Sequence, residues 1–159
     1  MQKWIISGFS VLALIAGLLV YQSQQFDFET LSGERYEWQD MHEQWIVVNY
    51  FAEWCAPCLK EVPELNAFDE WTKTQPDVQL FAISYDPLSQ DALAGIRDKY
   101  EMDFALLVPA KTHFVPIKKP QYLPATYVIK PDGSITPPLL GDQTNETLQQ
   151  AIAQLKQSF

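Results

Sequence analysis

Residues 45–63, WIVVNYFAEWCAPCLKEVP, decide the fold of this chain. They begin with a continuous apolar run, Trp45–Phe51, whose β-branched and aromatic side chains are typical of a strand covered on both faces. A helix is predicted to follow, from Ala56 to about Thr74, because apolar side chains recur on one side of it: Leu59, Val62, Leu65, Phe68 and Trp71. Pro63 lies inside this helix and is expected to kink it. Two cysteines therefore lie where a buried strand meets the first turn of a helix.

Strands and helices alternate along the rest of the chain. Residues 26–38 have alternating apolar positions around Ser32-Gly33, which predicts a short hairpin. Further strands are predicted at 78–84 and 104–108, helices at 90–100 and 146–157, and a hairpin with strands 125–130 and 134–137 around the turn residues 131–133. This order indicates an α/β sandwich built on a mixed sheet.

Composition and charge exclude several classes of protein. The chain has 159 residues, enough for one domain with its own core, and its hydrophobic content of 47% is too high for a disordered chain. A formal net charge of -9 argues against a nucleic-acid-binding protein, which needs a basic face to neutralise phosphates.

The N-terminus has its own apolar segment. Residues 4–21 contain no charge and would span roughly 27 Å as a helix, which is just enough to cross the hydrocarbon layer. Because Lys3 precedes the segment and acidic sequence follows it, the N-terminus is expected in the cytoplasm and the remainder outside. A cleaved signal peptide is the alternative, although Val20-Tyr21-Gln22 lacks the small residues of a cleavage site. We expect residues 1–22 to be an uncleaved anchor, and residues 23–159 then carry 10 basic and 20 acidic side chains, a net charge of -10.

The two cysteines form a C-x-x-C pair, Cys55 and Cys58, in which a disulfide is possible across one helical turn. Cys55 falls at the helix N-terminus, where the helix dipole and free N–H groups favour a thiolate, so Cys55 is the expected nucleophile and Cys58 the resolving thiol. Pro57 suits the first helical turn, where its missing N–H costs little. The alternatives are a structural bridge or half of a zinc site, but His42 and His113 lack the spacing of a ligand pair.

Two segments resemble the TlpA/ResA-type, membrane-anchored thioredoxin-like proteins. The first is Tyr50–Cys58, YFAEWCAPC, followed by KEVP at 60–63, and the second is LPATYVI at 123–129, followed by Pro-Asp-Gly at 131–133. The resemblance implies a thioredoxin-like three-layer sandwich with a mixed central sheet, preceded by one transmembrane helix. It divides the chain into an anchor, 1–22, and a thioredoxin-like domain, 23–159.

The resemblance also implies roles for individual residues. Pro124 matches the family's cis-proline, which lies against the disulfide, and the backbone at Leu123 would pair with an extended substrate; an ordinary trans-proline turn is the alternative. Trp54 would shield the disulfide, although tryptophan is also a good packing residue. Glu61 matches an acidic residue three positions after the second cysteine, where it would tune the pKa of the Cys58 thiol or relay a proton. A solvated helix carboxylate is the alternative for Glu61.

Two features depart from related proteins. Asn49 stands where cytosolic thioredoxins carry a buried aspartate, so the carboxylate that assists deprotonation of the buried thiol is missing there. Residues 108–122 replace a short helix with a loop, because Pro116 and Pro120 prevent a continuous helix. This loop collects basic side chains in an acidic domain, namely Lys111, His113, Lys118 and Lys119. It is either a solvated basic loop or a surface that selects an acidic partner.

These features predict an extracytoplasmic thiol–disulfide oxidoreductase. The Ala56-Pro57 dipeptide lacks the Pro-His pair of strongly oxidising DsbA-type proteins, which favours a reductant of protein disulfides. By resemblance, we expect a membrane-embedded thiol electron donor, a protein disulfide substrate such as apocytochrome c, and a single-pass location in the inner membrane with the domain in the periplasm. No metal, nucleic acid or cofactor beyond the Cys55–Cys58 disulfide is expected. The alternatives are a non-catalytic module that uses the cysteines to bind a metal or a partner, and a peroxidase, for which the Pro-x-x-x-Thr-x-x-Cys pattern is missing.

Overall fold

The computed structural model describes residues 26–159. The predicted anchor, residues 1–22, lies outside the described residues. Within the described part of the chain, no helix combines the length and apolar character needed to cross a membrane.

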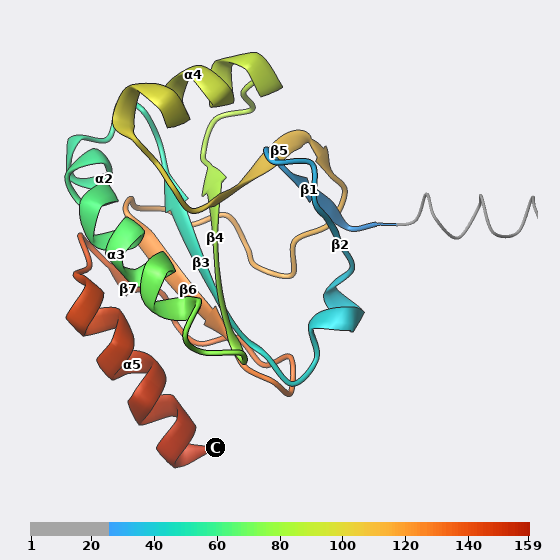
Figure 1. Ribbon diagram of the computed structural model, residues 1–159, viewed down its shortest axis with the longest axis vertical. Coiled ribbons are helices and arrows are strands. Elements are labelled where there is room, and N and C mark those ends of the chain that lie inside the picture. The colour runs from blue at the N-terminus through green and yellow to red at the C-terminus, as the bar shows by residue number, and fades with distance from the viewer. Residues whose placement is uncertain (1–25) are drawn as a thin grey trace, which may run out of the picture.

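A seven-stranded mixed sheet forms the centre of the domain, with strand order β2-β1-β5-β4-β3-β6-β7 (Figure 1). Its strands are β1 (Phe28–Thr30), β2 (Arg35–Tyr36), β3 (Trp45–Phe51), β4 (Val78–Ser84), β5 (Ala105–Thr112), β6 (Ala125–Ile129) and β7 (Leu139–Leu140). The three central strands β3, β4 and β5 are parallel, and β1, β6 and β7 pair antiparallel to their neighbours. All seven residues of β3 are buried, as its continuous apolar sequence predicts.

Within residues 26–159, four α-helices and one 3-10 helix accompany the sheet. They are η1 (Trp38–Met41), α2 (Ala56–Lys60), α3 (Val62–Thr72), α4 (Gln90–Tyr100) and α5 (Asn145–Ser158). Ser89 caps α4 by accepting a hydrogen bond from the Ala92 N–H, and Thr144 caps α5 in the same way from the Thr147 N–H. These caps explain why both helices begin within a residue of the positions that the sequence predicts.

The two faces of the sheet are covered differently. On one face, Val47 and Phe51 of β3 belong to a core shared with α3, α4 and α5. On the other face, Ile46 and Val48 pack in a second core that includes Met41 of η1 and Ile117 of the segment 113–124. One outer layer of the expected three-layer sandwich is therefore helical, and the other consists of η1 and a loop (Figure 1). Prolines at 116 and 120 account for the missing helix in the second layer.

Three boundaries differ from the sequence prediction. The helix predicted over 56–74 is divided at Glu61 into α2 and α3, with Pro63 in the first turn of α3. Strand β5 continues to Thr112 rather than ending at Val108, because it pairs with β1. The hairpin predicted around 131–133 forms only in part: Ile135 bridges Ile129, and the Thr136 N–H donates to the Val128 carbonyl at 2.9 Å, but the strand paired with the start of β6 is β7.

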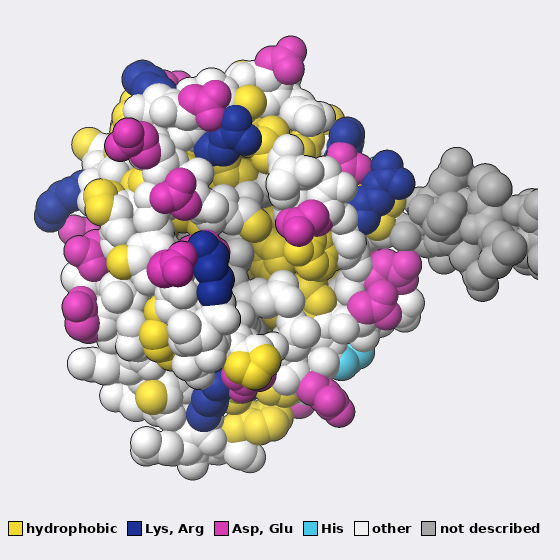
Figure 2. Space-filling view, viewed as in Figure 1, with side chains coloured by type: hydrophobic (Ala, Val, Ile, Leu, Met, Phe, Trp, Pro, Cys, Tyr) yellow, Lys and Arg dark blue, Asp and Glu magenta, His cyan; other side chains and the backbone are white. Residues whose placement is uncertain are grey.

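Charged side chains of both signs are interspersed over the face of the domain shown in Figure 2, with hydrophobic side chains visible at its centre. Ion pairs between surface side chains, such as Lys60 with Asp142 and Lys99 with Glu53, account for several of the opposite-sign neighbours. Each such exposed pair stabilises the fold by less than about 1 kcal/mol.

Candidate active site

The cysteines Cys55 and Cys58 form a disulfide at the point where β3 leads into α2. Their Cα atoms are 5.3 Å apart, and Cys55 is the N-cap residue of α2. The Sγ atom of Cys55 accepts a hydrogen bond from the Cys58 N–H at 3.3 Å. Such a bond stabilises negative charge on sulfur, so after reduction the Cys55 thiolate is favoured.

Both cysteine residues are buried, with 5% of the surface of Cys55 and 1% of the surface of Cys58 exposed. Both cysteines pack in the helical-side core. A tight turn holds them there, because the Cys55 N–H donates to the Ala52 carbonyl at 3.1 Å. Pro57 lies in the first turn of α2, where the sequence predicts it. That Cys55 is the attacking thiol and Cys58 the resolving thiol stays a prediction.

The segment Leu123-Pro124 lies beside the start of β6, next to the end of β3 that leads to the cysteines. The peptide bond between these two residues is cis, as expected. Strand β6 pairs with β3 through Ala125 opposite Tyr50, and the Pro124 carbonyl accepts a hydrogen bond from the Gly141 N–H at 3.0 Å. Leu123 is half-buried and packs against the core that contains both cysteines. Pairing with β3 therefore fixes the cis-proline segment beside the end of the strand that leads to Cys55.

Glu61 is buried, with 2% of its surface exposed. Its two carboxylate oxygens accept hydrogen bonds from Asn49 Nδ2 at 2.8 Å and from the Gln143 backbone N–H at 2.9 Å. Burial raises the pKa of Glu61 from 4.5 to about 7, with Asp142 adding to the increase and the two hydrogen bonds opposing it. The alternative of a solvated helix carboxylate is therefore wrong, and Glu61 can exchange a proton near neutral pH.

Asn49 connects this carboxylate to the centre of the sheet. Its side chain is fully buried, and Nδ2 donates both to Glu61 and to Thr126 Oγ1, the latter at 3.0 Å. The Oδ1 atom of Asn49 has no hydrogen-bond partner among the described residues. A polar cluster of Asn49, Glu61 and Thr126 therefore lies inside the otherwise apolar core next to the cysteine helix.

Trp54 is exposed, with 66% of its surface accessible. Its indole Nε1 donates to Asp86 Oδ2 at 2.8 Å, and its ring meets that of Tyr85 edge-on, with 6.0 Å between the centroids. These contacts hold an aromatic surface directly before Cys55. That Trp54 shields the disulfide stays a prediction.

The basic side chains of residues 111–119 differ in their contacts. Lys111 lies in β5 and forms an ion pair with the buried carboxylate of Glu29, and the imidazole of His113 packs on Phe26. Lys119 instead lies over the Tyr85 ring, with Nζ 3.6 Å from the centroid. The structure thus separates Lys111 and His113 from the side chains next to the cysteines.

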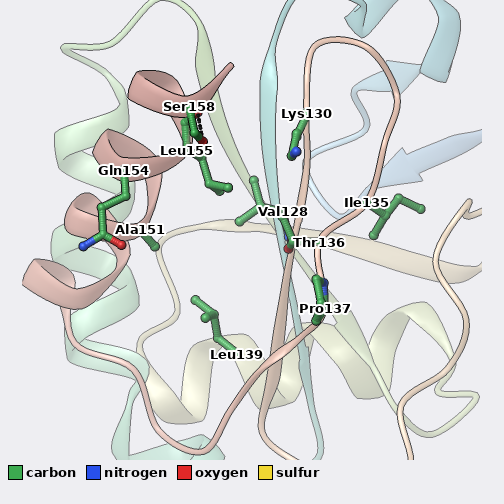
Figure 3. Close-up of a pocket in the computed structure, with 10 residues that line it drawn as sticks. All are labelled: Val128, Lys130, Ile135, Thr136, Pro137, Leu139, Ala151, Gln154, Leu155 and Ser158. Atoms are coloured by element: carbon green, nitrogen blue, oxygen red, sulfur yellow. Dashed lines mark hydrogen bonds between the residues drawn. The ribbon is translucent and has the colours of Figure 1, made fainter.

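The groove beside α5 is not a candidate reaction site. It has a volume of about 550 Å³ between β6, residues 135–139 and α5 (Figure 3). Lys130 is the one ionisable side chain among the described residues that line it, and no thiol, imidazole or carboxylate does. Within residues 26–159, no group of three or more histidine, cysteine or acidic side chains is arranged to hold a metal ion.

Comparison with models of protein families identifies the family of this chain. A model of the AhpC/TSA family matches residues 21–137, which is well over half of the chain. The chain belongs to the AhpC/TSA family. The similarity to ResA-type proteins that the motifs indicate is also confirmed, since a thiol-disulfide oxidoreductase ResA of Bacillus cereus is 25% identical over 128 residues, covering 80% of this chain and 73% of ResA.

Two further proteins are similar to this chain, one in sequence and one in structure. The thioredoxin-like protein YneN of Bacillus subtilis is 25% identical over 131 residues, covering 82% of this chain and 76% of YneN. The crystal structure of StoA from Bacillus subtilis superposes with a TM-score of 0.66 at 20% identity, covering 79% of this chain and 93% of StoA. This structural similarity confirms the thioredoxin-like α/β fold with its mixed sheet.

The sequence did not identify four residues that contact the predicted site residues Asn49, Trp54 and Glu61. They are Tyr85, Asp86, Thr126 and Gln143. Asp86 and Tyr85 follow β4, and the carboxyl ends of adjacent parallel strands lie at one edge of a sheet, so their closeness to Trp54 was inferable from topology. Thr126 belongs to the segment 123–129 that resembles ResA-type proteins, and in β6 it pairs with Asn49 of β3. Gln143 acts through its backbone N–H, and no side-chain pattern predicts such a contact.

Proposed function

We propose that this chain is an extracytoplasmic thiol–disulfide oxidoreductase that reduces protein disulfides through Cys55 and Cys58. The observation that supports it most is the disulfide between them at the start of α2, with the Cys58 N–H directed at Cys55 Sγ. The names of the relatives agree with it, since several are thiol-disulfide oxidoreductases.

The reaction begins with the reduced protein. The Cys55 thiolate attacks one sulfur of a substrate disulfide, forms a mixed disulfide and releases the other substrate sulfur as a thiolate. The Cys58 thiolate then attacks Cys55 Sγ, which releases the second substrate thiol and closes the Cys55–Cys58 disulfide. Two electrons pass from the protein dithiol to the substrate, and a thiol donor returns them.

Glu61 serves the second step in this proposal. It follows Cys58 by three residues, so both side chains lie on one side of the helix. Because its pKa is about 7, Glu61 can take up the proton that Cys58 loses on becoming a thiolate. Asn49 orients the carboxylate through its hydrogen bond and is a positioning residue.

Substrate pairing is assigned to the surface around Trp54, Leu123 and Pro124. Leu123 packs against the core that contains both cysteines, and Trp54 offers an exposed ring directly before Cys55. An extended segment of a protein substrate would lie between them, and Ala56 and Pro57 would shape the surface between the cysteines.

The cellular setting is part of the proposal. Residues 1–22 would anchor the domain to the inner membrane, with residues 23–159 in the periplasm or an equivalent extracytoplasmic space. There a membrane-embedded thiol protein would supply electrons, and apocytochrome c, whose cysteines must be reduced before haem attachment, is one candidate substrate.

Trapping tests the proposal directly. Cys58→Ser should accumulate a mixed disulfide between Cys55 and a disulfide substrate such as insulin, visible on a non-reducing gel and lost on reduction. Cys55→Ser should form none and should not reduce insulin. If Cys55→Ser keeps full activity, the exchange mechanism is wrong. Stoichiometric metal in the purified protein together with inert cysteines would instead support the metal-binding alternative.

A further inference from the structure

We propose that Lys118 and Lys119, with the aromatic side chains of Trp54, Tyr85 and Tyr122, form a specificity surface that favours substrates with acidic residues beside the target cysteine. The proposal rests on the proposed function and names the substrate class of the same site. These five exposed or half-buried residues come from three separate segments of the chain.

The two lysines are held at a fixed place. Ile117 and Pro120 on either side of them are buried, and Ile117 packs in the core against the sheet. Lys118 and Lys119 are exposed between these anchors. A loop anchored at both sides presents its side chains in a more defined position than a free loop.

Lys119 connects this loop to the disulfide. Its Nζ lies 3.6 Å from the centroid of the Tyr85 ring, within the range of a cation–π contact. The Tyr85 N–H donates to the Phe51 carbonyl at 2.7 Å, so Tyr85 lies at the end of the strand that leads to Cys55. The Tyr85 ring meets Trp54 edge-on. Lysine, tyrosine and tryptophan thus form a continuous row that ends at the residue before the nucleophile.

The other end of the loop leads to Leu123 and Pro124, where the substrate backbone is proposed to pair. Tyr122 has 69% of its surface exposed and directly precedes Leu123 and Pro124. A peptide paired with the backbone at Leu123 would therefore lie beside Tyr122, in the same loop as the two lysines. Rigid aromatic rings of this kind contribute contact area to interfaces at low entropic cost.

The charges around this surface favour an acidic substrate segment. Lys111 is neutralised by Glu29, whereas Lys118 and Lys119 form no ion pair within residues 26–159. Of the two carboxylates beside Trp54, Glu53 is paired with Lys99, whereas Asp86 accepts a hydrogen bond from the neutral Trp54 indole and keeps its negative charge. The two lysines outnumber this one carboxylate. Because charges beyond about 8 Å are screened at physiological ionic strength, the net negative charge of the domain acts weakly on a docked peptide, and the two lysines act at contact.

Three matched peptide disulfides test the proposal. Each is a homodimer of one short peptide whose single cysteine is flanked by two aspartates, two asparagines or two lysines. The fully reduced protein is mixed with each, and the second-order rate constant for loss of protein thiol is measured by rapid alkylation and mass spectrometry. No electron donor is required in this single-turnover design. The wild type should react with the aspartate peptide about three- to tenfold faster than with the lysine peptide.

Charge reversal supplies the variants. Lys118→Glu and Lys119→Glu should each reduce this preference, and the double variant should invert it. Lys130→Glu is the matched control, because it makes the same change in net charge after the end of β6, opposite to the end that begins beside Pro124, and should leave the preference unchanged. Lys119→Arg keeps the charge and should keep the preference.

The neutral reagent 2,2′-dithiodipyridine separates the two levels of the proposal. The specificity surface is refuted if the reduced wild type reacts with this reagent and reacts with all three peptides at equal rates. It is also refuted if charge reversal at 118 and 119 leaves the ratio of the peptide rate constants unchanged. In both cases the proposed function stands. If the wild type reduces no disulfide at all, the proposed function fails.

Discussion

Glu61→Gln should change the pH dependence of stability more than any other single substitution of a carboxylate. Glu61 is 2% exposed, and burial raises its pKa from 4.5 to about 7. Between these values the folded protein binds a proton that the unfolded chain has lost, so stability falls as the pH rises from 4.5 and levels off above 7. Each pKa unit corresponds to about 1.4 kcal/mol, so the ionised carboxylate costs the folded state about 3 kcal/mol at pH 8.

The glutamine variant removes this cost. Glutamine is neutral at every pH and keeps an oxygen that can accept from the Gln143 N–H. Its amide would face Asn49 Nδ2, so the Asn49 side-chain amide has to turn over for Oδ1, which has no partner among the described residues of the wild type, to accept from it. The variant should therefore match the wild type at about pH 4.5 and exceed it by about 2–3 kcal/mol at pH 8, the upper figure being the full cost of ionisation.

Urea denaturation of the oxidised protein between about pH 4.5 and 8.5, followed by tryptophan fluorescence, measures the difference. Other titrating groups are common to both proteins, so they cancel when the two free energies of unfolding are subtracted. Glu146→Gln, at an exposed position in the first turn of α5, is the control and should leave the wild-type pH profile unchanged. Parallel pH profiles for wild type and Glu61→Gln would refute the buried, protonated carboxylate.

Three further predictions concern the Glu61 hydrogen bond, the helical-side core and the cap of α5. Asn49→Leu removes a donor to Glu61, so the pH at which the wild type loses stability should move upward; an unchanged midpoint in the same urea series would contradict the role of the hydrogen bond. Phe68→Ala deletes a fully buried ring from the helical-side core and should cost about 3–5 kcal/mol in denaturant unfolding, whereas a loss below about 1 kcal/mol would mean that the core is packed differently. Thr144→Ala removes the N-cap of α5 and should cost about 1 kcal/mol, and Thr144→Ser, which keeps the hydroxyl, should restore most of it.

Sequence pattern located the elements of the fold that depend on local signals. The continuous apolar run of β3 and the Ser89 cap of α4 specify those elements without reference to distant residues. Boundaries set by pairing were not visible in the same way. Strand β5 extends to Thr112 because β1 pairs with it, and the strand beside β6 is β7 rather than 134–137 because residues 139–140 pair with 125–126.

The features of the candidate site also fall into two groups: those that the sequence predicts and those that depend on contacts with distant residues. The C-x-x-C motif and the resemblance to ResA-type proteins predicted the Cys55–Cys58 disulfide and the cis bond before Pro124, and the structure has both. They left Glu61 undecided between a solvated and a buried carboxylate, because its burial depends on Gln143, which lies 82 residues further along the chain. Likewise, the basic loop was one feature in the sequence, and only the contacts with Glu29 and Tyr85 separate Lys111 from Lys119.

The reduction potential of the Cys55–Cys58 couple tests the central claim most directly. The protein is equilibrated in dithiothreitol and glutathione buffers at about pH 7, and the fraction of free thiols is measured by alkylation and mass spectrometry. The proposed reductant should give one reversible two-electron transition near thioredoxin's ~-270 mV, whereas a value near ~-120 mV would contradict the reducing role.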